Sequence, residues 1–357
     1  MERNAYFHGL KVIELASVLA GPAVGMFFAE LGAQVIKIEN KNGGDLTRHW
    51  KTVNENSNSN TSSYFHSINW NKKSLFLDLL NETDYALALQ HISEADIVLV
   101  NFKDGDAKKF NLESNYLRKK FPKLIIGEII GYPNSDRVAY DAVLQAETGF
   151  MSMNGNTDSG PLKMPIAFID LFAAHQLKEG ILIAMLQKNK NNIGAIVTVS
   201  LFESAIASLA NQASNYLNNN QVPKLLGSLH PNIAPYGEVM YTKDGKQIIL
   251  AVGTDQQFYR LCKILDLESI ANDENYKSNL QRVKNRISLY EELKIVFRNF
   301  NVDMLLSQFD IHKIPAGKIN NLQQVFEDEN AKKMILEQLE EDQTISKRVS
   351  TIAFNIE

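Results

Sequence analysis

The feature that most restricts the fold is the alternation of short β-rich runs with helical patterns in the first half of the chain. Strand-like runs cover residues 10–15, 34–39, 74–80, 96–102 and 123–130, and helical patterns cover 22–31, 82–94 and 112–121. Strands that alternate with helices predict βαβ units and a parallel sheet. We therefore expect an α/β fold whose large domain is Rossmann-like, with an open, mostly parallel sheet.

The pattern changes after Asn218. Asp244-Gly245 lies between two strand-like runs within residues 241–250, which predicts a β-hairpin, and a helical pattern follows at 255–265. We expect a large domain over residues 1–218, a smaller α+β domain over 223–318, and a C-terminal segment over 319–357 that returns to the large domain.

Bulk composition excludes several classes of function. The 357 residues carry a net charge of −4, which gives no global basic field for nucleic acid or an anionic membrane. The single Cys262 excludes an intrachain disulfide and a multi-cysteine metal site, and we predict no metal. Gly21-Pro22 interrupts the first apolar run, which argues against a signal peptide, and no run approaches the roughly 18 apolar residues of a membrane span. We expect a cytoplasmic protein.

Asp170 is the strongest candidate for chemistry. It follows the apolar residues 166–169 and precedes a helical pattern that continues to Leu186, so we expect it at a strand-to-helix junction, where open α/β sheets place their ligands. A carboxylate that emerges from an apolar wall is partly desolvated, which makes it a better nucleophile while it stays ionised. The alternative is a helix N-cap with no chemical role.

Other candidates are weaker when each is taken alone. Tyr140-Asp141 opens a helical segment, where a tyrosine usually packs against the protein. Lysines at or next to the ends of predicted strands suit a nucleotide-like ligand, although most surface lysines are only solvated: Lys37, Lys72, Lys73, Lys103, Lys108 and Lys109. His230 has no nucleophile motif or metal-ligand spacing near it, so we interpret it as structural.

Several other motifs occur in the chain together with Asp170: Gly9–Leu15 leading into Ala20–Ala23, Val35–Glu39, Gly43–Arg48, and Tyr140–Gly149. Together they resemble the class III coenzyme A (CoA) transferases of the CaiB/BaiF type, the family of the formyl-CoA and carnitine CoA-transferases. The resemblance runs from about Leu10 to Ile352.

The resemblance implies a mechanism. Asp170 would attack an acyl-CoA, giving an aspartyl anhydride and then an aspartyl-CoA thioester that passes CoA to a free carboxylic acid. The acyl-CoA is a substrate, and no permanently bound cofactor is needed. The implied partners are the acyl-CoA, the carboxylic acid and a second copy of the chain in an interlocked homodimer, with neither nucleic acid nor a membrane.

The resemblance also implies roles for the remaining candidate residues. A substrate pocket would be formed by Leu19, Trp50, Tyr140, Asp141, Gly253 and Thr254. The adenosine end of CoA would lie at Asn101-Phe102 and the basic residues after it, Lys103 and Lys109, with Lys37, Lys72 and Lys73 as further candidates. Here the chain has Asn-Phe-Lys-Asp-Gly where the family commonly has Asn-Phe-Arg-Pro-Gly. Leu19 stands where formyl-CoA transferases have glutamine, which argues against formyl or oxalyl substrates.

Two alternatives remain open. An α-methylacyl-CoA racemase would use the same CoA site and Asp170, but racemases carry histidine at the position of Tyr140. A phenol with a pKa near 10 is a poor second base at neutral pH. A non-catalytic acyl-CoA-binding protein is the other alternative.

Overall fold

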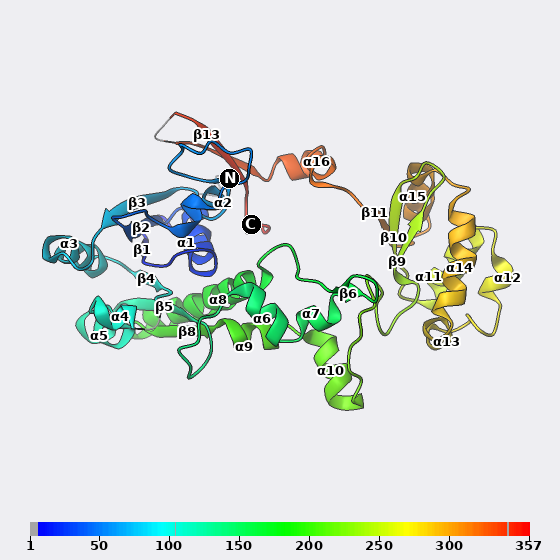
Figure 1. Cartoon of the computed structure of the whole chain (residues 1–357), viewed down its shortest axis with the longest axis horizontal. Coiled ribbons are helices and arrows are strands. Elements are labelled where there is room, and N and C mark those ends of the chain that lie inside the picture. The colour runs from blue at the N-terminus through cyan, green and yellow to red at the C-terminus, as the bar shows by residue number, and fades with distance from the viewer. Residues whose placement is uncertain (1–5, 104, 341–342) are drawn as a thin grey trace. The chain divides into compact units, whose positions relative to one another are not determined.

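The computed structural model describes residues 6–103, 105–340 and 343–357 (Figure 1). Over these residues the chain divides into two compact units. The first comprises residues 1–150, 164–213 and 332–357, and the second comprises 151–163 and 214–331.

Within the described residues, the first unit is built on a six-stranded sheet in which every neighbouring pair of strands is parallel. The spatial order is β3 (Lys72–Leu77), β2 (Gln34–Asn40), β1 (Lys11–Glu14), β4 (Ile97–Val100), β5 (Ile125–Ile130) and β8 (Ile196–Ser200). The strand order reverses between β1 and β4, the doubly wound arrangement that places ligands at this point. The predicted α/β fold with an open parallel sheet is confirmed.

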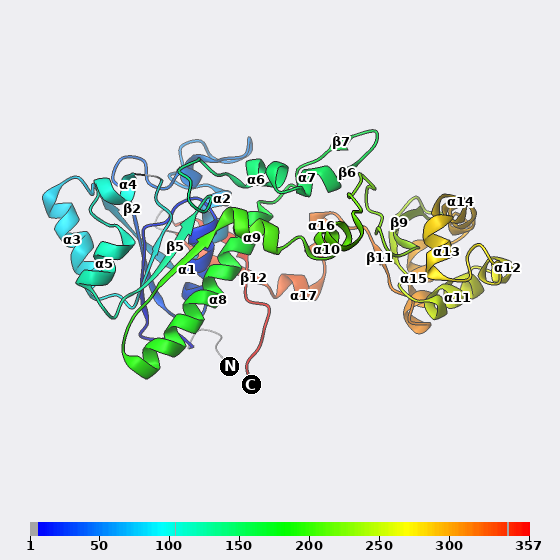
Figure 2. The same cartoon turned by 90° about the horizontal axis from the view of Figure 1, so that it is seen from below.

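Helices cover both faces of this sheet because the central strands are apolar on both sides (Figures 1 and 2). On one face, Val12 of β1 packs in a core with α1 (Ala20–Glu30), α8 (Phe168–Asn191) and α9 (Leu201–Ala207). On the other face, the next residue, Ile13, packs in a core that includes α3 (Glu82–Ser93) and α5 (Ser114–Lys120). Successive residues of one strand thus supply two cores.

The predicted elements fall close to the observed ones, with shifts at their ends. The strand predicted at 74–80 is β3 at Lys72–Leu77. It ends early because the Asp78 side chain accepts a hydrogen bond from the backbone N–H of Leu80, which turns the chain. The side chain of Asn81 then accepts from the N–H groups of Thr83 and Asp84 and begins α3.

The second unit has its own core. As far as the structure describes it, its sheet has three antiparallel strands in the order β11 (Ala316–Lys318), β10 (Gln247–Ala251) and β9 (Tyr236–Tyr241). The predicted hairpin joins β9 to β10, and Gly245 has the left-handed φ of 71° that its turn requires. The predicted helix is α11 (Asp255–Ile264), whose N-terminus carries a capping box of Thr254 and Gln257.

The helices that follow α11 in this unit include α12 (Glu268–Ala271), α13 (Asn279–Lys284), α14 (Arg286–Phe297) and α15 (Val302–Ile311), which give it its α+β character. The remaining elements of the described chain are η1 (Leu46–His49), α2 (Ser63–Ile68), α4 (Asp106–Lys109), α6 (Asp141–Glu147), α7 (Phe150–Met153), β6 (Gly155–Asn156), β7 (Gly160–Pro161), α10 (Ala210–Asn219), α16 (Leu322–Val325), α17 (Glu329–Lys332), β12 (Ile335–Leu339) and β13 (Ile345–Val349).

The end of the chain packs on the first unit. Strands β12 and β13 form an antiparallel hairpin, and the Arg348 guanidinium pairs with the buried Glu30 carboxylate of α1. Ser350 and Thr351 also donate to Glu30. Burial would raise the pKa of Glu30, but these hydrogen bonds and Arg348 together lower it. Glu30 is thus an ionised anchor for the last strand.

The described residues contain neither a membrane-spanning helix nor a metal-binding cluster. None of the helices that the structure describes is long and apolar enough to cross a membrane. No group of three or more His, Cys, Asp or Glu side chains in the described ranges is arranged to hold a metal ion.

Candidate active site

Asp170 lies in the first turn of α8, but residues 162–167, directly before this helix, form no strand. The helix begins at Phe168, with Ala167 at the N-cap, and residues 164–167 are irregular. The predicted strand-to-helix junction is therefore wrong. Pro165 has no N–H to give to a sheet, and the N–H of Met164 donates to the side-chain oxygen of Gln145. This apolar run is held by α6 instead.

Asp141, the first residue of α6, fixes the start of α8. Its buried carboxylate accepts a hydrogen bond from the backbone N–H of Ile169 at 2.9 Å and another from Gln145 Nε2 at 2.5 Å. Because Ala167 has no side-chain cap to offer, Asp141 satisfies an orphan N–H of the first turn from another helix. Gln145, which the sequence did not indicate, completes this support from α6.

The carboxylate of Asp170 is poorly solvated. Burial, and then the negative charge of Asp141, raise its pKa from 3.8 to about 7. Among the residues that the structure describes, no donor hydrogen-bonds to this carboxylate. Its lone pairs are therefore not engaged by the protein, which is the condition for an activated oxygen nucleophile.

Tyr64 of α2 lies in the same neighbourhood and was not predicted. Burial, followed by the charges of Asp170, Asp141 and Asp45, raises the pKa of its phenol to about 12. Tyr64 packs against the small apolar cluster that contains Leu19, as Ala167 and Leu171 on either side of Asp170 also do. Tyr64 follows a polar Asn- and Ser-rich segment, so its sequence context gave no signal of a site.

Trp50 joins this group from the loop after η1. Its ring packs edge to face on Tyr64 with the two ring centroids 5.1 Å apart, and the residue is 43% exposed. Leu19, Trp50 and Asp141, three of the predicted pocket residues, are thus gathered around Tyr64 and the first turn of α8. Tyr140 occupies the N-cap position of α6 directly before Asp141, and half of it is exposed.

The turn between β1 and α1 is held in a strained conformation next to Leu19. Val18 has a φ of 71°, which is costly for a β-branched residue. Its N–H donates to the Asp45 carboxylate at 3.2 Å. The Asn101 side chain accepts from the N–H of Ser17 and donates to its carbonyl. Asn101, predicted as a CoA ligand, therefore uses its amide to join the ends of β1 and β4.

Two of the predicted CoA-binding lysines, Lys37 and Lys72, are held in buried ion pairs. The Lys37 ammonium pairs with Glu14 at 2.8 Å and Asp45 at 3.0 Å, and the Lys72 ammonium pairs with Glu14 at 2.8 Å. Both side chains are 1% exposed, although Lys37 is among the residues that line the cavity described next. Burial lowers the pKa of Lys72 to about 8, whereas for Lys37 the two carboxylates outweigh burial and raise the pKa.

A cavity of about 300 Å³ lies at the carboxyl ends of the central strands. Its lining includes Leu15 to Ser17 after β1, Glu39-Asn40 of β2, and Phe102, Lys109 and Phe110 after β4. The rings of Phe102 and Phe110 are 6.0 Å apart between centroids, and Lys109 Nζ lies 5.4 Å from the centroid of Phe110. Aromatic faces beside a cation suit a nucleotide at the switch point of an open sheet.

Lys73 and Lys103 do not line this cavity. Both are exposed, Lys73 on the edge strand β3 and Lys103 in the segment before α4.

Gly253 and Thr254 belong to the second unit, where they precede α11. Gln257 Oε1 accepts hydrogen bonds from both of their N–H groups. A Cβ at Gly253 would come no closer than 3.9 Å to Gln257 Oε1, so packing within the unit does not require glycine there. His230 is used structurally: its Nδ1 accepts from the N–H of Asn232, and its ring packs on Tyr236.

Comparison with known proteins agrees with this architecture. The family model described as CoA-transferase family III matches residues 7–355. The succinate–glutarate CoA-transferase of Agrobacterium fabrum is 38% identical over 333 residues, which cover 91% of this chain and 83% of that protein. The succinyl-CoA:glutarate CoA-transferase of Homo sapiens is 33% identical over 89% of this chain and 72% of its own.

Solved structures show the same fold. A CaiB/BaiF family protein from Brucella suis superposes with a TM-score of 0.83 at 34% identity and covers 98% of this chain and 93% of its own. Rv3272 from Mycobacterium tuberculosis gives a TM-score of 0.84 at 23% identity over 99% of this chain and 94% of its own. On the match over nearly its whole length and on these identities, the chain belongs to CoA-transferase family III and is a CoA-transferase.

Proposed function

We propose that this CoA-transferase moves CoA from an acyl-CoA thioester to a free carboxylic acid with Asp170 as the covalent nucleophile. The observation that carries the proposal is the setting of this carboxylate: it lies partly buried in the first turn of α8, and no described residue donates a hydrogen bond to it. Burial and the charge of Asp141, which raise its pKa to about 7, agree with this setting. A partly desolvated carboxylate is a better nucleophile toward an activated carbonyl while it stays ionised.

The steps balance without an external acid or base. An oxygen of Asp170 attacks the thioester carbonyl, the C–S bond breaks, and CoA leaves as the thiolate. The thiolate attacks the aspartyl carbonyl of the anhydride, which releases the donor acid and leaves an aspartyl-CoA thioester. The acceptor carboxylate then displaces CoA to form a second anhydride, and the thiolate attacks the acceptor's carbonyl, which restores Asp170.

The residues around Asp170 have two proposed roles, which are to position the nucleophile and to line the acyl pocket. Asp141 and Gln145 hold the turn that carries Asp170, so they position the nucleophile without touching the substrate. Leu19 and Trp50, with Tyr64, supply apolar surface for the acyl group. Because the pKa of Tyr64 is about 12, its hydroxyl keeps its proton at neutral pH and remains a hydrogen-bond donor. Tyr140, Gly253 and Thr254 stay proposed members of the pocket.

For CoA itself, we assign the adenosine end to the cavity lined by Phe102 and Lys109. Lys73 and Lys103 remain candidates for the phosphates because both are exposed. The interlocked homodimer and a cytoplasmic location also remain proposals, and they rest on the family resemblance and on composition.

Dicarboxylic acids are the proposed substrate class. The similar proteins of Agrobacterium fabrum and Homo sapiens are named for transfer between succinate or succinyl-CoA and glutarate, and a protein of Haloarcula hispanica, 30% identical, is named for transfer between succinyl-CoA and mesaconate. We therefore infer succinyl-CoA as a donor and a short dicarboxylate as the acceptor.

Substitution at Asp170 tests the proposal. Asp170→Asn keeps the shape of the side chain but removes its charge, so CoA transfer from succinyl-CoA to glutarate should fall at least about a hundredfold. Asp136→Asn, in an exposed loop, is the matched control and should retain full activity. Intact mass after succinyl-CoA and hydroxylamine should show a trapped adduct in wild type and in the control only. An active or labelled Asp170→Asn protein would remove Asp170 as the nucleophile.

A further inference from the structure

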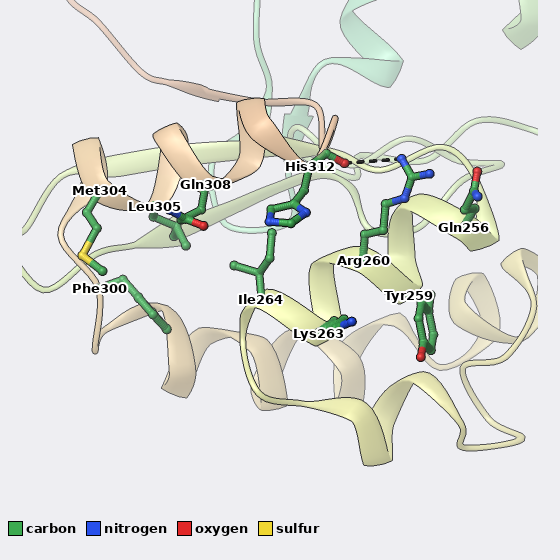
Figure 3. A pocket seen from close by; sticks show the side chains of 10 residues that line it. All are labelled: Gln256, Tyr259, Arg260, Lys263, Ile264, Phe300, Met304, Leu305, Gln308 and His312. Atoms are coloured by element: carbon green, nitrogen blue, oxygen red, sulfur yellow. Dashed lines mark hydrogen bonds between the residues drawn. The ribbon is translucent and has the colours of Figure 1, made fainter.

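The second unit contains a groove of about 620 Å³ that the transfer chemistry does not use. It lies between α11 and α15, and we call it the α11–α15 groove. The ten lining residues are Gln256, Tyr259, Arg260, Lys263, Ile264, Phe300, Met304, Leu305, Gln308 and His312 (Figure 3). Its volume falls within the roughly 300–1,000 Å³ typical of small-molecule sites.

The groove arises from the way the two helices use their faces. Helix α11 buries Phe258, Leu261 and Cys262 in the core of the unit, which turns Gln256, Arg260 and Lys263 outward along the other face. Helix α15 likewise buries Leu305 and Phe309 and leaves Met304, Gln308 and the following His312 exposed.

Arg260 and the apolar Met304 lie toward opposite ends of the groove, and Lys263 lies between them beside Ile264 (Figure 3). Arg260 and Gln256 lie at one end, where Arg260 Nη1 donates to the carbonyl oxygen of His312 at 3.4 Å (Figure 3). Phe300 and Met304 lie at the opposite end, with Leu305 and Gln308 beside them. Met304 is 62% exposed.

The charge of the groove is uncompensated. None of its ten lining residues is acidic. Among the residues that the structure describes, neither Arg260 nor Lys263 forms an ion pair, although most other arginines of this unit are held in ion pairs or buried hydrogen bonds, such as Arg282 and Arg286. The one long hydrogen bond to His312 leaves most guanidinium N–H groups of Arg260 unused.

From this arrangement we propose that the α11–α15 groove binds an amphipathic organic anion, a carboxylate carried on an apolar chain. The carboxylate pairs with Arg260 and Lys263, and the chain lies along Ile264 and Leu305 toward Met304. A guanidinium binds a carboxylate through parallel hydrogen bonds, and an apolar floor favours a chain over a small hydrophilic anion. The site does not depend on the proposed catalytic mechanism, because it shares no residue with it.

The test follows the methyl signal of Met304 in the full-length protein labelled with ¹³C-methyl methionine, with Met304→Leu to assign it. Octanoate should shift this signal saturably. Octanamide, which has the chain but no charge, and acetate, which has the charge but no chain, should each bind at least about tenfold more weakly.

Charge removal completes the test. Arg260→Gln combined with Lys263→Gln should raise the dissociation constant for octanoate about tenfold, because two exposed ion pairs are lost. Lys284→Gln, which removes an exposed lysine of α13 outside the groove, should not change it. Unchanged octanoate affinity in the double variant, or equal affinity for octanamide, overturns the proposal. So does a Met304 signal that responds to protein concentration and not to octanoate, because the groove would then be a contact between copies.

Discussion

The raised pKa of Asp170 predicts a pH dependence that an ordinary aspartate would not give. Only the ionised carboxylate attacks a thioester, so the rate follows the ionised fraction. With a pKa of about 7, roughly a tenth of the groups are ionised at pH 6 and roughly nine tenths at pH 8. We therefore expect kcat/KM for succinyl-CoA to rise about tenfold between these pH values. With the usual value of 3.8, the same interval would be flat.

The assay is the initial rate of CoA transfer at low succinyl-CoA and saturating glutarate, from pH 5.5 to 8.5 at constant ionic strength. Under these conditions kcat/KM reports the pKa of the free enzyme. Asp141→Asn separates Asp170 from other titrating groups, because it removes the second cause of the raised pKa and should shift the profile to lower pH. A wild-type profile that is flat down to pH 5.5 would refute the reasoning.

The same raised pKa affects stability. Between the unfolded pKa of 3.8 and the folded pKa of about 7, the folded protein holds a proton that the unfolded chain has lost, so this contribution to stability falls as pH rises through that window. The shift corresponds to at most about 4 kcal/mol, and we expect about 1–2 kcal/mol after discounting for partial exposure. Between pH 4 and pH 8, the free energy of unfolding of Asp170→Asn, measured in urea, should therefore rise by this amount relative to that of wild type. Asp136→Asn should show no such relative rise.

Three further predictions concern the lysines and the type of reaction. Lys72→Met leaves the buried Glu14 with one fewer partner and should lower the free energy of unfolding by about 3–5 kcal/mol. In protein that still folds, KM for succinyl-CoA should change little. A higher KM without a loss of stability would return Lys72 to the CoA site. Lys109→Gln should weaken CoA binding a few-fold and reduce its dependence on salt in calorimetry, because Lys109 is the cation beside the proposed adenosine end; an unaltered affinity and salt slope would place the adenosine end elsewhere. In heavy water, 2-methylacyl-CoA should gain no α-deuterium under conditions that allow transfer, because Tyr140 is a poor second base; rapid deuteration would favour a racemase.

The sheet was predictable because its information is local. Runs such as residues 96–102 and 123–130 are apolar, short and separated by helical patterns, and this alternation predicts a parallel sheet. Asp170 and Asp141 were recognisable from motifs, and in the structure Asp141 accepts a hydrogen bond from the N–H of Ile169 in the turn that carries Asp170.

The roles of the lysines were not predictable, because they depend on register. Glu14 of β1 pairs directly with Lys37 of β2, so the partner of Lys37 is set by how two strands align and not by its neighbours in sequence. Lys72 reaches the same carboxylate from β3. From sequence these side chains look like solvated cations near strand ends. Tyr64 was missed for a similar reason, because only the folded chain brings α2 toward the first turn of α8.

The most direct test of the central claim is the transfer of oxygen from the acceptor acid to Asp170. In the proposed steps, one oxygen of the acceptor carboxylate becomes the bridging atom of the second anhydride and stays on Asp170 when the thiolate takes the acyl group. After turnover of succinyl-CoA with ¹⁸O-labelled glutarate, the peptide that contains Asp170 should therefore gain the label, and fragmentation should place it on this side chain. Ongoing transfer with no ¹⁸O on Asp170 would contradict the covalent mechanism.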